Sequence, residues 1–239
     1  MPQESLEEKI ASLEKSVERV QAARDVENIM NSYEYKLFAG GLFEEVVGLF
    51  AQKTPGVTVE IGNWGVYEGI EGVKKIYLGM HKNDMWDEKL NCMRPGIMFI
   101  NANNNPIIEV AGDGKTAKGL WISQGITAVP KHGTWGTDDK MEARWFWQRR
   151  AADFVKEDGK WKMWHYHAYP VVDTPFDRSW VDVDENEVNI NALRPTTLPD
   201  KWKADKPSTY VWLYKPSARV EYVPRAPEPY ETFDETFSY

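Results

Sequence analysis

Cysteine and long apolar runs are scarce in this chain of 239 residues. The single cysteine, Cys92, excludes an intramolecular disulfide framework and a cysteine-based zinc site. A membrane-spanning helix needs about 18 consecutive apolar residues, and no such run is present. The first residues are polar and charged, so they lack the apolar core of a secretory leader. We therefore expect a cytoplasmic protein with no membrane partner.

Basic residues are outnumbered: 29 Lys and Arg stand against 37 Asp and Glu, a formal net charge of −8. Binding to nucleic acid without sequence preference requires basic side chains that displace counterions from phosphates, so no nucleic-acid partner is expected. Aromatic residues are abundant, with 11 Trp, 11 Tyr and 9 Phe. The length suits one large domain with a sizeable core, or one domain with an extension.

The first part of the chain has the period of amphipathic helices. Residues 4–38 are predicted to be helical in two pieces, the second ending at Gly40-Gly41. In the first piece the apolar residues recur at spacings of three and four: Leu6, Ile10, Leu13, Val17 and Val20. Shorter helices are predicted over 42–51 and 69–81, with two short strands, 57–62 and 64–69, between them.

From Gly96 the period changes to two, which is typical of strands, with turn signals at Asp113-Gly114 and Asp158-Gly159. From about Asn191 the chain becomes rich in Pro and aromatic residues. Helices followed by consecutive antiparallel strands predict an α+β fold, in which a curved sheet wraps the helices around a ligand pocket. The domains expected are an N-terminal helical extension (1–22), a core domain (23–190) and a C-terminal arm (191–239).

Four segments together resemble a known family. They are YEYKLFAGGLFEEVVGLFA, YEGIEGVKKIY, NPIIEVAGDGKTAKGLW and RWFWQRRAADFVKEDGKWKMWHYH. Their order and spacing, over roughly Ala23 to Pro170, resemble the SnoaL-like branch of the nuclear-transport-factor-2-like superfamily, whose fold is the cystatin-like cone. The resemblance implies acid–base chemistry without a cofactor on a bulky apolar substrate, and assembly as a homodimer or homotrimer. Members include scytalone dehydratase, ketosteroid isomerase, polyketide cyclases and lignin-derived diarylpropane lyases that release formaldehyde.

The chain departs from the best-known relatives at the positions that carry their chemistry. Leu37 and Phe38 stand where scytalone dehydratase has a Tyr-Asp pair, and Met98 and Trp121 stand where it has two histidines. Any catalysis in this chain must therefore use a different set of groups. Fold alone does not choose among the reactions of the superfamily, and some relatives only bind ligands.

Two histidines in GKWKMWHYHAY are the first catalytic candidates. Strict alternation places His165 and His167 on the same face as Trp161, and Lys160 and Lys162 on the other, so both histidines are expected to point inward. Histidine is well suited to acid–base work near neutral pH. The alternative is that each histidine is a hydrogen-bonded residue of the pocket wall with no catalytic role. A cupin-like metal site is the remaining reading, but the further ligands it needs are missing, so no metal is expected.

Three more residues complete the predicted catalytic set. Pairing across the Asp158-Gly159 turn places Arg150 opposite His167, where it could stabilise an anion or pair with an acid. Tyr33 lies on a buried helical stripe and could donate its hydroxyl to the substrate or simply be core. Glu60 faces either the solvent or the pocket, where burial would make it a base. Six residues are expected to bind substrate: Tyr77, His81, Phe99, Trp121, Phe146 and Lys36.

These features predict a cofactor-independent lyase for a hydrophobic, hydroxylated aromatic small molecule, with loss of water or of formaldehyde. A lignin-type diarylpropane is the preferred substrate class. The alternatives are an isomerase or cyclase of the ketosteroid-isomerase or polyketide-cyclase kind, and a ligand-binding or assembly subunit without catalysis. An outer sheet face carrying Trp145, Trp147, Trp164 and Tyr166 is expected to be covered by the C-terminal arm or by another subunit.

Overall fold

The chain begins with one long helix that runs into the body of the molecule. In the computed structural model, which describes residues 5–130, 140–182 and 200–239, α1 (Leu6–Glu34) continues without a break into a π-helical turn, η1 (Tyr35–Ala39). The prediction of two helical pieces is wrong, because the residues around Ala22 are good helix formers that leave no break. The expected boundary between residues 22 and 23 falls inside α1. Gly41, at φ +58°, turns the chain after η1.

Four further helical segments form one cluster beside the end of α1. They are α2 (Phe43–Gly48), α3 (Gly69–Lys74), the π-helical η2 (Lys75–His81) and α4 (Lys82–Met85). The last three follow one another directly, so the helix predicted over 69–81 extends to Met85. This extension matters for the site, because it brings the residues after His81 onto a helical face.

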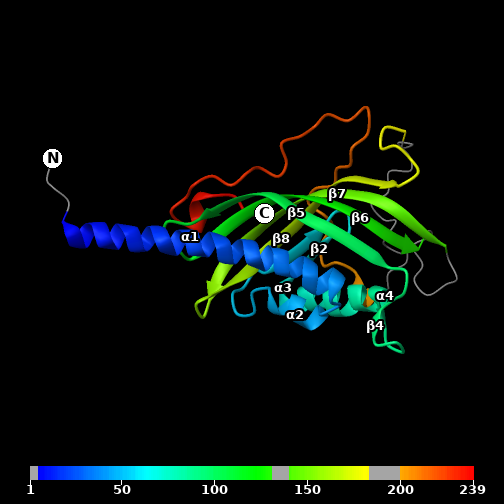
Figure 1. Cartoon of the computed structure of the whole chain (residues 1–239), viewed down its shortest axis with the longest axis horizontal. Helices are drawn as coiled ribbons and strands as arrows, with labels where there is room; N and C mark the ends of the chain where they lie inside the picture. The colour runs from blue at the N-terminus through cyan, green and yellow to red at the C-terminus, as the bar shows by residue number, and fades with distance from the viewer. Residues whose placement is uncertain (1–4, 131–139, 183–199) are drawn as a thin grey trace.

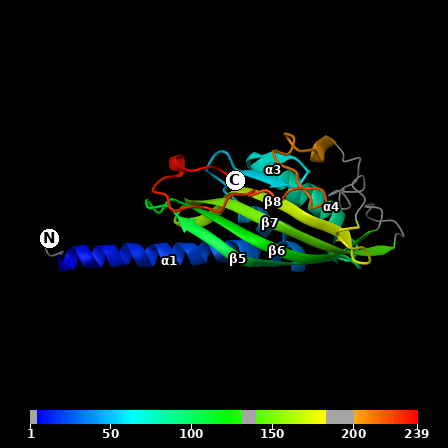
Figure 2. The same ribbon diagram turned by 90° about the horizontal axis from the view of Figure 1, so that it is seen from above.

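A six-stranded curved sheet holds the helices on its concave side (Figures 1 and 2). Its order is β2-β1-β8-β7-β6-β5, antiparallel except that β1 and β8 run parallel. The strands are β1 (Thr58–Ile61), β2 (Val66–Glu68), β5 (Met98–Val110), β6 (Thr116–Pro130), β7 (Met141–Glu157) and β8 (Lys160–Pro175). A separate small pair joins β3 (Trp86–Asp87) to β4 (Cys92–Met93). The α+β class and the cystatin-like arrangement are confirmed.

A β-bulge near the start of β8 changes which side chains face inward. The Asp158-Gly159 turn has φ of +48° and +75°, as a two-residue hairpin turn requires, and pairs Glu157 with Lys160. The register holds as far as Phe154 opposite Met163 and then shifts, so that Asp153 lies opposite His165. Trp164 is therefore an extra residue. A bulge reverses the alternation of everything beyond it.

The C-terminal arm, described from residue 200, crosses the outer face of the sheet (Figure 1). Tyr214 N–H donates to the Val171 carbonyl at 2.8 Å, and the arm's Tyr230 carbonyl accepts from Gly112 N–H at 2.9 Å. The start of the expected arm, residues 191–199, lies outside the described residues. On the predicted outer face the arm covers Trp164, whose ring lies 4.8 Å from that of Phe233, whereas Trp147 is 40% exposed. Tyr166, also predicted for this face, lines the inner pocket instead. Within the described ranges, no helix is both long and apolar enough to cross a membrane.

Candidate functional site

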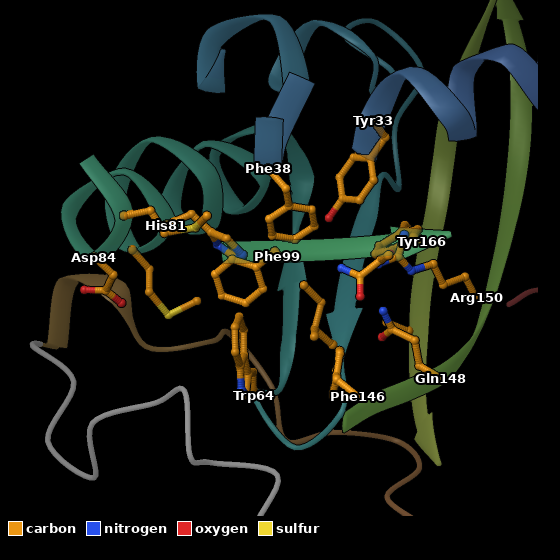
Figure 3. A pocket seen from close by; sticks show the side chains of 15 residues that line it. Tyr33, Phe38, Trp64, His81, Asp84, Phe99, Phe146, Gln148, Arg150 and Tyr166 are labelled. Carbon is orange, nitrogen blue, oxygen red and sulfur yellow. The ribbon is translucent and has the colours of Figure 1, made fainter. Parts of the chain in front are cut away.

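A pocket opens between the concave face of the sheet and the ends of the helices (Figure 3). The space between its lining atoms, including the part open to solvent, is about 640 Å³. Its walls come from the helical segments, the β1–β2 connection and strands β1, β5, β7 and β8. They are formed by Tyr33, Phe38, Ile61, Trp64, Met80, His81, Asp84, Met85, Phe99, Asn101, Phe146, Gln148, Arg150, Tyr166 and Ala168.

Aromatic side chains make up the middle of the pocket. Phe38 from η1 stacks on Phe99 from β5, with ring centroids 4.9 Å apart and planes 27° apart. Trp64 and Phe146 extend this surface, as Figure 3 shows. Both π-helical segments end at the pocket, and the extra residue in such a turn commonly marks a functional site. The aromatic lining suits a flat, apolar ligand.

Arg150 forms one polar end of the pocket. Its Nη1 donates to Glu34 at the end of α1 and to Asn103 Oδ1 at 3.2 Å. With the Gln148 amide turned so that its oxygen faces the guanidinium, that oxygen accepts from Nε at 2.9 Å and Nη2 at 2.7 Å. Arg150 and Glu34 are both buried, so the ion pair offsets the cost of removing two charges from water. The guanidinium is thereby held in one orientation.

Tyr33 and Tyr166 lie beside Arg150, and Tyr77 lies behind Tyr33. The hydroxyls of Tyr33 and Tyr77 share a hydrogen bond at 3.0 Å, and the rings of Tyr33 and Tyr166 lie 5.2 Å apart. Burial raises the pKa of all three phenols, so they stay protonated and act as hydrogen-bond donors. In Figure 3 the hydroxyl of Tyr33 points into the pocket. When Tyr77 donates to Tyr33, the proton of Tyr33 is available to a ligand.

His81 and Asp84 form the other polar end, one helical turn apart (Figure 3). His81 Nδ1 lies 3.0 Å from the Ile76 carbonyl, which can only accept, so Nδ1 carries the proton and Nε2 is left as an acceptor. Burial lowers the pKa of His81 to about 4, so the ring is neutral at pH 7. Burial raises the pKa of Asp84 to about 6, against weaker opposing effects from Asn83 and Arg94.

Five of the predicted site residues lie together in this pocket: Tyr33, Arg150, His81, Phe99 and Phe146. They come from one helix end, one π-helix and two strands that are distant in sequence. Their roles in binding or catalysis remain predictions.

The inward orientation predicted for His165 and His167 is wrong. Both lie beyond the bulge at Trp164, so they face outward and Tyr166 takes the inward position. His165 Nδ1 lies 2.8 Å from Asp153 Oδ2, beneath the C-terminal arm. Arg150 is opposite Ala168 and not, as predicted, His167.

Glu60 also faces the arm. Its carboxylate accepts from the backbone N–H of Thr209 at 2.6 Å and from the Thr209 hydroxyl at 2.8 Å. His167 Nε2 lies 3.3 Å from Glu60 Oε1, and the His167 ring stacks on Tyr169 at 3.7 Å. The carboxylate therefore anchors the arm, so Glu60 faces neither the solvent nor the pocket, the two orientations expected from the sequence.

Three predicted substrate-binding residues lie outside the pocket wall. Tyr77 is fully buried behind Tyr33, and its hydroxyl shares a hydrogen bond with the Tyr33 hydroxyl. Trp121 is buried in the core against Phe154, with rings 6.2 Å apart. Lys36 forms an ion pair with Glu45 at the surface of the helical cluster.

The sequence patterns did not indicate six polar or aromatic residues of the pocket wall, or Glu34, the partner of Arg150 behind it. The six are Phe38, Trp64, Asp84, Asn101, Gln148 and Tyr166. The helix predicted from the sequence ends at His81, which leaves Asp84 outside it. A helix running to Met85 places Asp84 three residues from His81, on the same face, which is the signal that could have found it. Among the described residues, no group of three His, Cys, Asp or Glu side chains is placed to hold a metal ion.

Comparison with solved structures gives matches of low sequence identity. A nuclear-transport-factor-2-like protein with a cystatin-like fold from Novosphingobium aromaticivorans is 12% identical, with 74% of this chain and 94% of that chain covered and a TM-score of 0.46. A type 3 hexachlorocyclohexane dehydrochlorinase from Novosphingobium barchaimii is 11% identical, with 68% and 94% covered and a TM-score of 0.49. Comparison with curated proteins gives no match.

The sequence model of the SnoaL-like domain matches residues 18–167, which is more than half of the chain. This range includes α1 from its middle, the helical cluster, and the sheet as far as the middle of β8. It therefore holds every residue of the pocket except Ala168. The chain belongs to the SnoaL-like domain family.

Proposed function

We propose that this protein is a cofactor-independent lyase that removes water or formaldehyde from a hydroxylated aromatic small molecule. The observation that carries the proposal is the division of the pocket into two polar ends and an aromatic middle. Asp84 and His81 lie at one end, and Arg150 lies at the other (Figure 3). This division supports a reaction in which a proton moves at one end while negative charge develops toward the other.

Asp84 is the residue assigned as the base. Because its pKa is raised to about 6, its carboxylate is ionised at neutral pH and yet holds a proton more strongly than an ordinary aspartate. A base works best when its pKa lies near the working pH, because it is then both unprotonated and able to retain the proton it takes. The neutral His81 next to it, with Nε2 as an acceptor, suits a hydrogen bond from a substrate hydroxyl.

Loss of water can proceed with Asp84 alone moving the proton. The carboxylate removes a proton from the carbon next to the carbinol, and the electron pair of that C–H bond forms the new double bond. The C–O bond breaks, and the departing hydroxide takes the proton back from Asp84 and leaves as water. The carboxylate is regenerated and no oxidant, reductant or cofactor is consumed.

Loss of formaldehyde uses the same group on a primary carbinol. Asp84 then removes the hydroxyl proton, the carbon–carbon bond breaks and formaldehyde leaves. The carbon left behind takes the proton from Asp84. A substrate of the diarylpropane kind offers both the two aromatic rings that the middle of the pocket suits and the primary carbinol that this step needs.

Arg150 and Tyr33 are assigned to the negative charge that develops on the substrate. A phenolic or carbonyl oxygen of the substrate placed between them would receive the Tyr33 hydroxyl and the remaining N–H of Arg150 Nη2. Donors held in place in a buried site stabilise such charge without reorganising during the reaction. The contacts of Arg150 with Glu34 and Gln148 provide this fixed orientation.

A ligand-binding protein without catalysis is the second candidate, and one observation favours it. Four of the five N–H groups of Arg150 have protein partners within the described part of the chain, so little of its capacity is left for a ligand. In that case the aromatic middle would bind the ligand and neither polar end would change it.

The two candidates differ in what Asp84→Asn does. We expect this variant to bind hydroxylated aromatic compounds with unchanged affinity and to lose about 100-fold or more in turnover. Asp177→Asn, a similar change at an exposed position just after the end of β8, is the control and should behave as wild type. Turnover that is equal in the two variants would remove the assigned base, and binding without turnover in wild type would favour the second candidate.

A further inference from the structure

The N-terminal half of α1 presents an exposed row of large aliphatic side chains. Every described residue from 5 to 21 is exposed. Figures 1 and 2 show this half of the helix projecting beyond the edge of the sheet. The row consists of Leu6, Ile10, Leu13, Val17 and Val20, with exposed fractions between 47% and 73%. Such side chains at spacings of four and three form the narrow apolar seam of a coiled coil.

This seam lies on the opposite side of α1 from the face that packs against the body. The buried residues of α1 that contact the core, Val26, Met30 and Tyr33 among them, begin only after the seam has ended. At 100° per residue, the two rows are about 150° apart around the helix axis. A second helix could therefore lie along the seam without meeting the sheet of the same molecule.

We propose that two copies of this chain associate through a parallel, two-stranded coiled coil formed by residues 6–20 of α1. In such a dimer each body lies on the far side of its own helix, away from the other copy. The two α1 helices, one from each copy, enter their own bodies at the same end of the coiled coil. The pocket of each copy stays open because the seam residues do not line it.

The charges that flank the seam favour a parallel pairing of two identical helices. With Leu6, Leu13 and Val20 at the d positions, Lys9 occupies a g position and Glu14 the following e position. In a parallel dimer, Lys9 of each helix lies against Glu14 of the other, which gives two attractive pairs. In an antiparallel dimer centred on Leu13, the two Glu14 side chains lie near each other and repel.

The same charges disfavour a membrane surface as the occupant of the seam. Helices that lie on membranes carry many Lys and Arg residues on their polar face, since most of these surfaces are anionic. Residues 5–20 contain four acidic and three basic side chains, so the segment has a slight negative charge. A second copy of the chain, which supplies Lys9 for Glu14, complements the segment better.

The seam is short, but the helix that carries it is already formed in the single chain, which lowers the cost of association. Ser5 and Glu8 make a capping box at the first turn: Glu8 N–H donates to Ser5 Oγ at 3.2 Å, and Ser5 N–H donates to Glu8 Oε2 at 2.8 Å. The other end of α1 is anchored in the core. Association therefore does not have to nucleate a helix, which is the costly step for a short isolated segment.

The first test is the molar mass of the full chain from light scattering over a concentration series. We expect wild type to be a dimer, and Leu13→Lys with Val17→Lys to weaken association by about 100-fold or more, because four ammonium groups would be buried in the seam. Ala11→Lys with Ser12→Lys adds the same charge away from the seam and should leave the dimer intact. Equal far-UV circular dichroism would show that α1 remains helical in both variants.

The charged pairs give a second measurement. Lys9→Glu should weaken the dimer by about fivefold, and adding Glu14→Lys should restore it, because the attractive pairs return with reversed sign. An equal loss in the double variant would show that the pairs do not form. A wild type that stays monomeric at several hundred micromolar, or a dimer that survives Leu13→Lys with Val17→Lys, would overturn the proposal.

Disulfide formation tests the parallel orientation. In a Cys92→Ser background, which removes the exposed native thiol, Leu6→Cys alone and Val20→Cys alone should each form disulfide-linked dimers. An antiparallel pair would instead form the disulfide only when the Leu6→Cys and Val20→Cys proteins are mixed. That second pattern would overturn the orientation and with it the assigned Lys9–Glu14 contacts.

Discussion

Arg150 on β7 and Glu34, the last residue of α1, form a buried ion pair that joins the sheet to the helix at the wall of the pocket. Tyr33 precedes Glu34, so the pair also fixes the tyrosine that points into the pocket. The contact connects two segments 116 residues apart in the chain. It is the point at which the stability of the fold and the geometry of the site depend on the same two side chains.

Glu34→Gln should destabilise the protein more than its small change of shape suggests. It leaves the guanidinium of Arg150 buried without a counter-ion, and we expect the free energy of unfolding to fall by about 3 kcal/mol. Urea unfolding measures this directly. Adding Arg150→Met removes the unpaired charge, so the double variant should recover part of the loss. Purely additive effects of the two substitutions would mean that the pair does not interact.

The pH dependence of turnover should follow Asp84. Its pKa is raised to about 6 by burial, and the carboxylate is the form assigned as the base. The value of kcat/KM should therefore rise with pH through about 6 and level off above it, because the protonated form cannot accept a proton. His81, with a pKa of about 4, is neutral throughout this range. A profile that is flat between pH 5 and 7 would contradict the assignment.

The stability of the folded state should also respond to His81. Its folded pKa of about 4 is below the ordinary value of 6.5, so the unfolded chain binds a proton that the folded chain does not between these values. Stability is therefore lost as the pH falls below 6.5. Between pH 7 and 5 this contribution is about 2 kcal/mol.

His81→Gln isolates this effect, because the glutamine does not titrate. The raised pKa of Asp84 acts in the opposite direction, since its protonated form is favoured in the folded state, and this contribution is common to both proteins. Urea unfolding at pH 7 and pH 5 should show a smaller loss of stability in the variant than in wild type. The same loss in both proteins would mean that His81 is not buried in its neutral form.

His165→Gln should leave turnover within a factor of two of wild type, because this side chain lies on the outer face of the sheet. It contacts Asp153 and, at 3.0 Å, the hydroxyl of Ser238 in the C-terminal arm. Tyr33→Phe, by contrast, removes a hydroxyl inside the pocket and should lower turnover by about tenfold or more. A larger loss of activity from His165→Gln than from Tyr33→Phe would restore the inward orientation inferred from alternation.

The contrast between His165 and Tyr33 shows which features of the fold can be predicted from the sequence and which cannot. The period of the helices, the change to strands and the Asp158-Gly159 turn are local patterns, so the α+β class followed from them. Alternation along β8 is also local, but the extra residue at Trp164 reverses it. The strand face of His165 depends on how β7 and β8 pair, and no single-strand pattern contains that information.

Site residues could be predicted where an aromatic side chain lies on the inward face of a predicted helix or strand, as for Tyr33, Phe99 and Phe146. Asp84 was not, because its place depends on a helix that continues past a change to polar composition. Glu34 was not, because its buried partner lies far along the chain on β7. Both residues are charged and would be expected at the surface until the tertiary contact is known.

The central claim, that the pocket uses Asp84 to expel a small molecule from an aromatic substrate, is tested most directly by a mass balance. Panels of hydroxylated aromatic compounds are incubated with wild type or with Asp84→Asn, and the products are measured by high-resolution mass spectrometry with formaldehyde assayed in parallel. We predict that wild type yields a product lighter by one water or one formaldehyde and that Asp84→Asn binds the same compound without converting it. A product of unchanged mass, or equal conversion by the variant, would contradict the account.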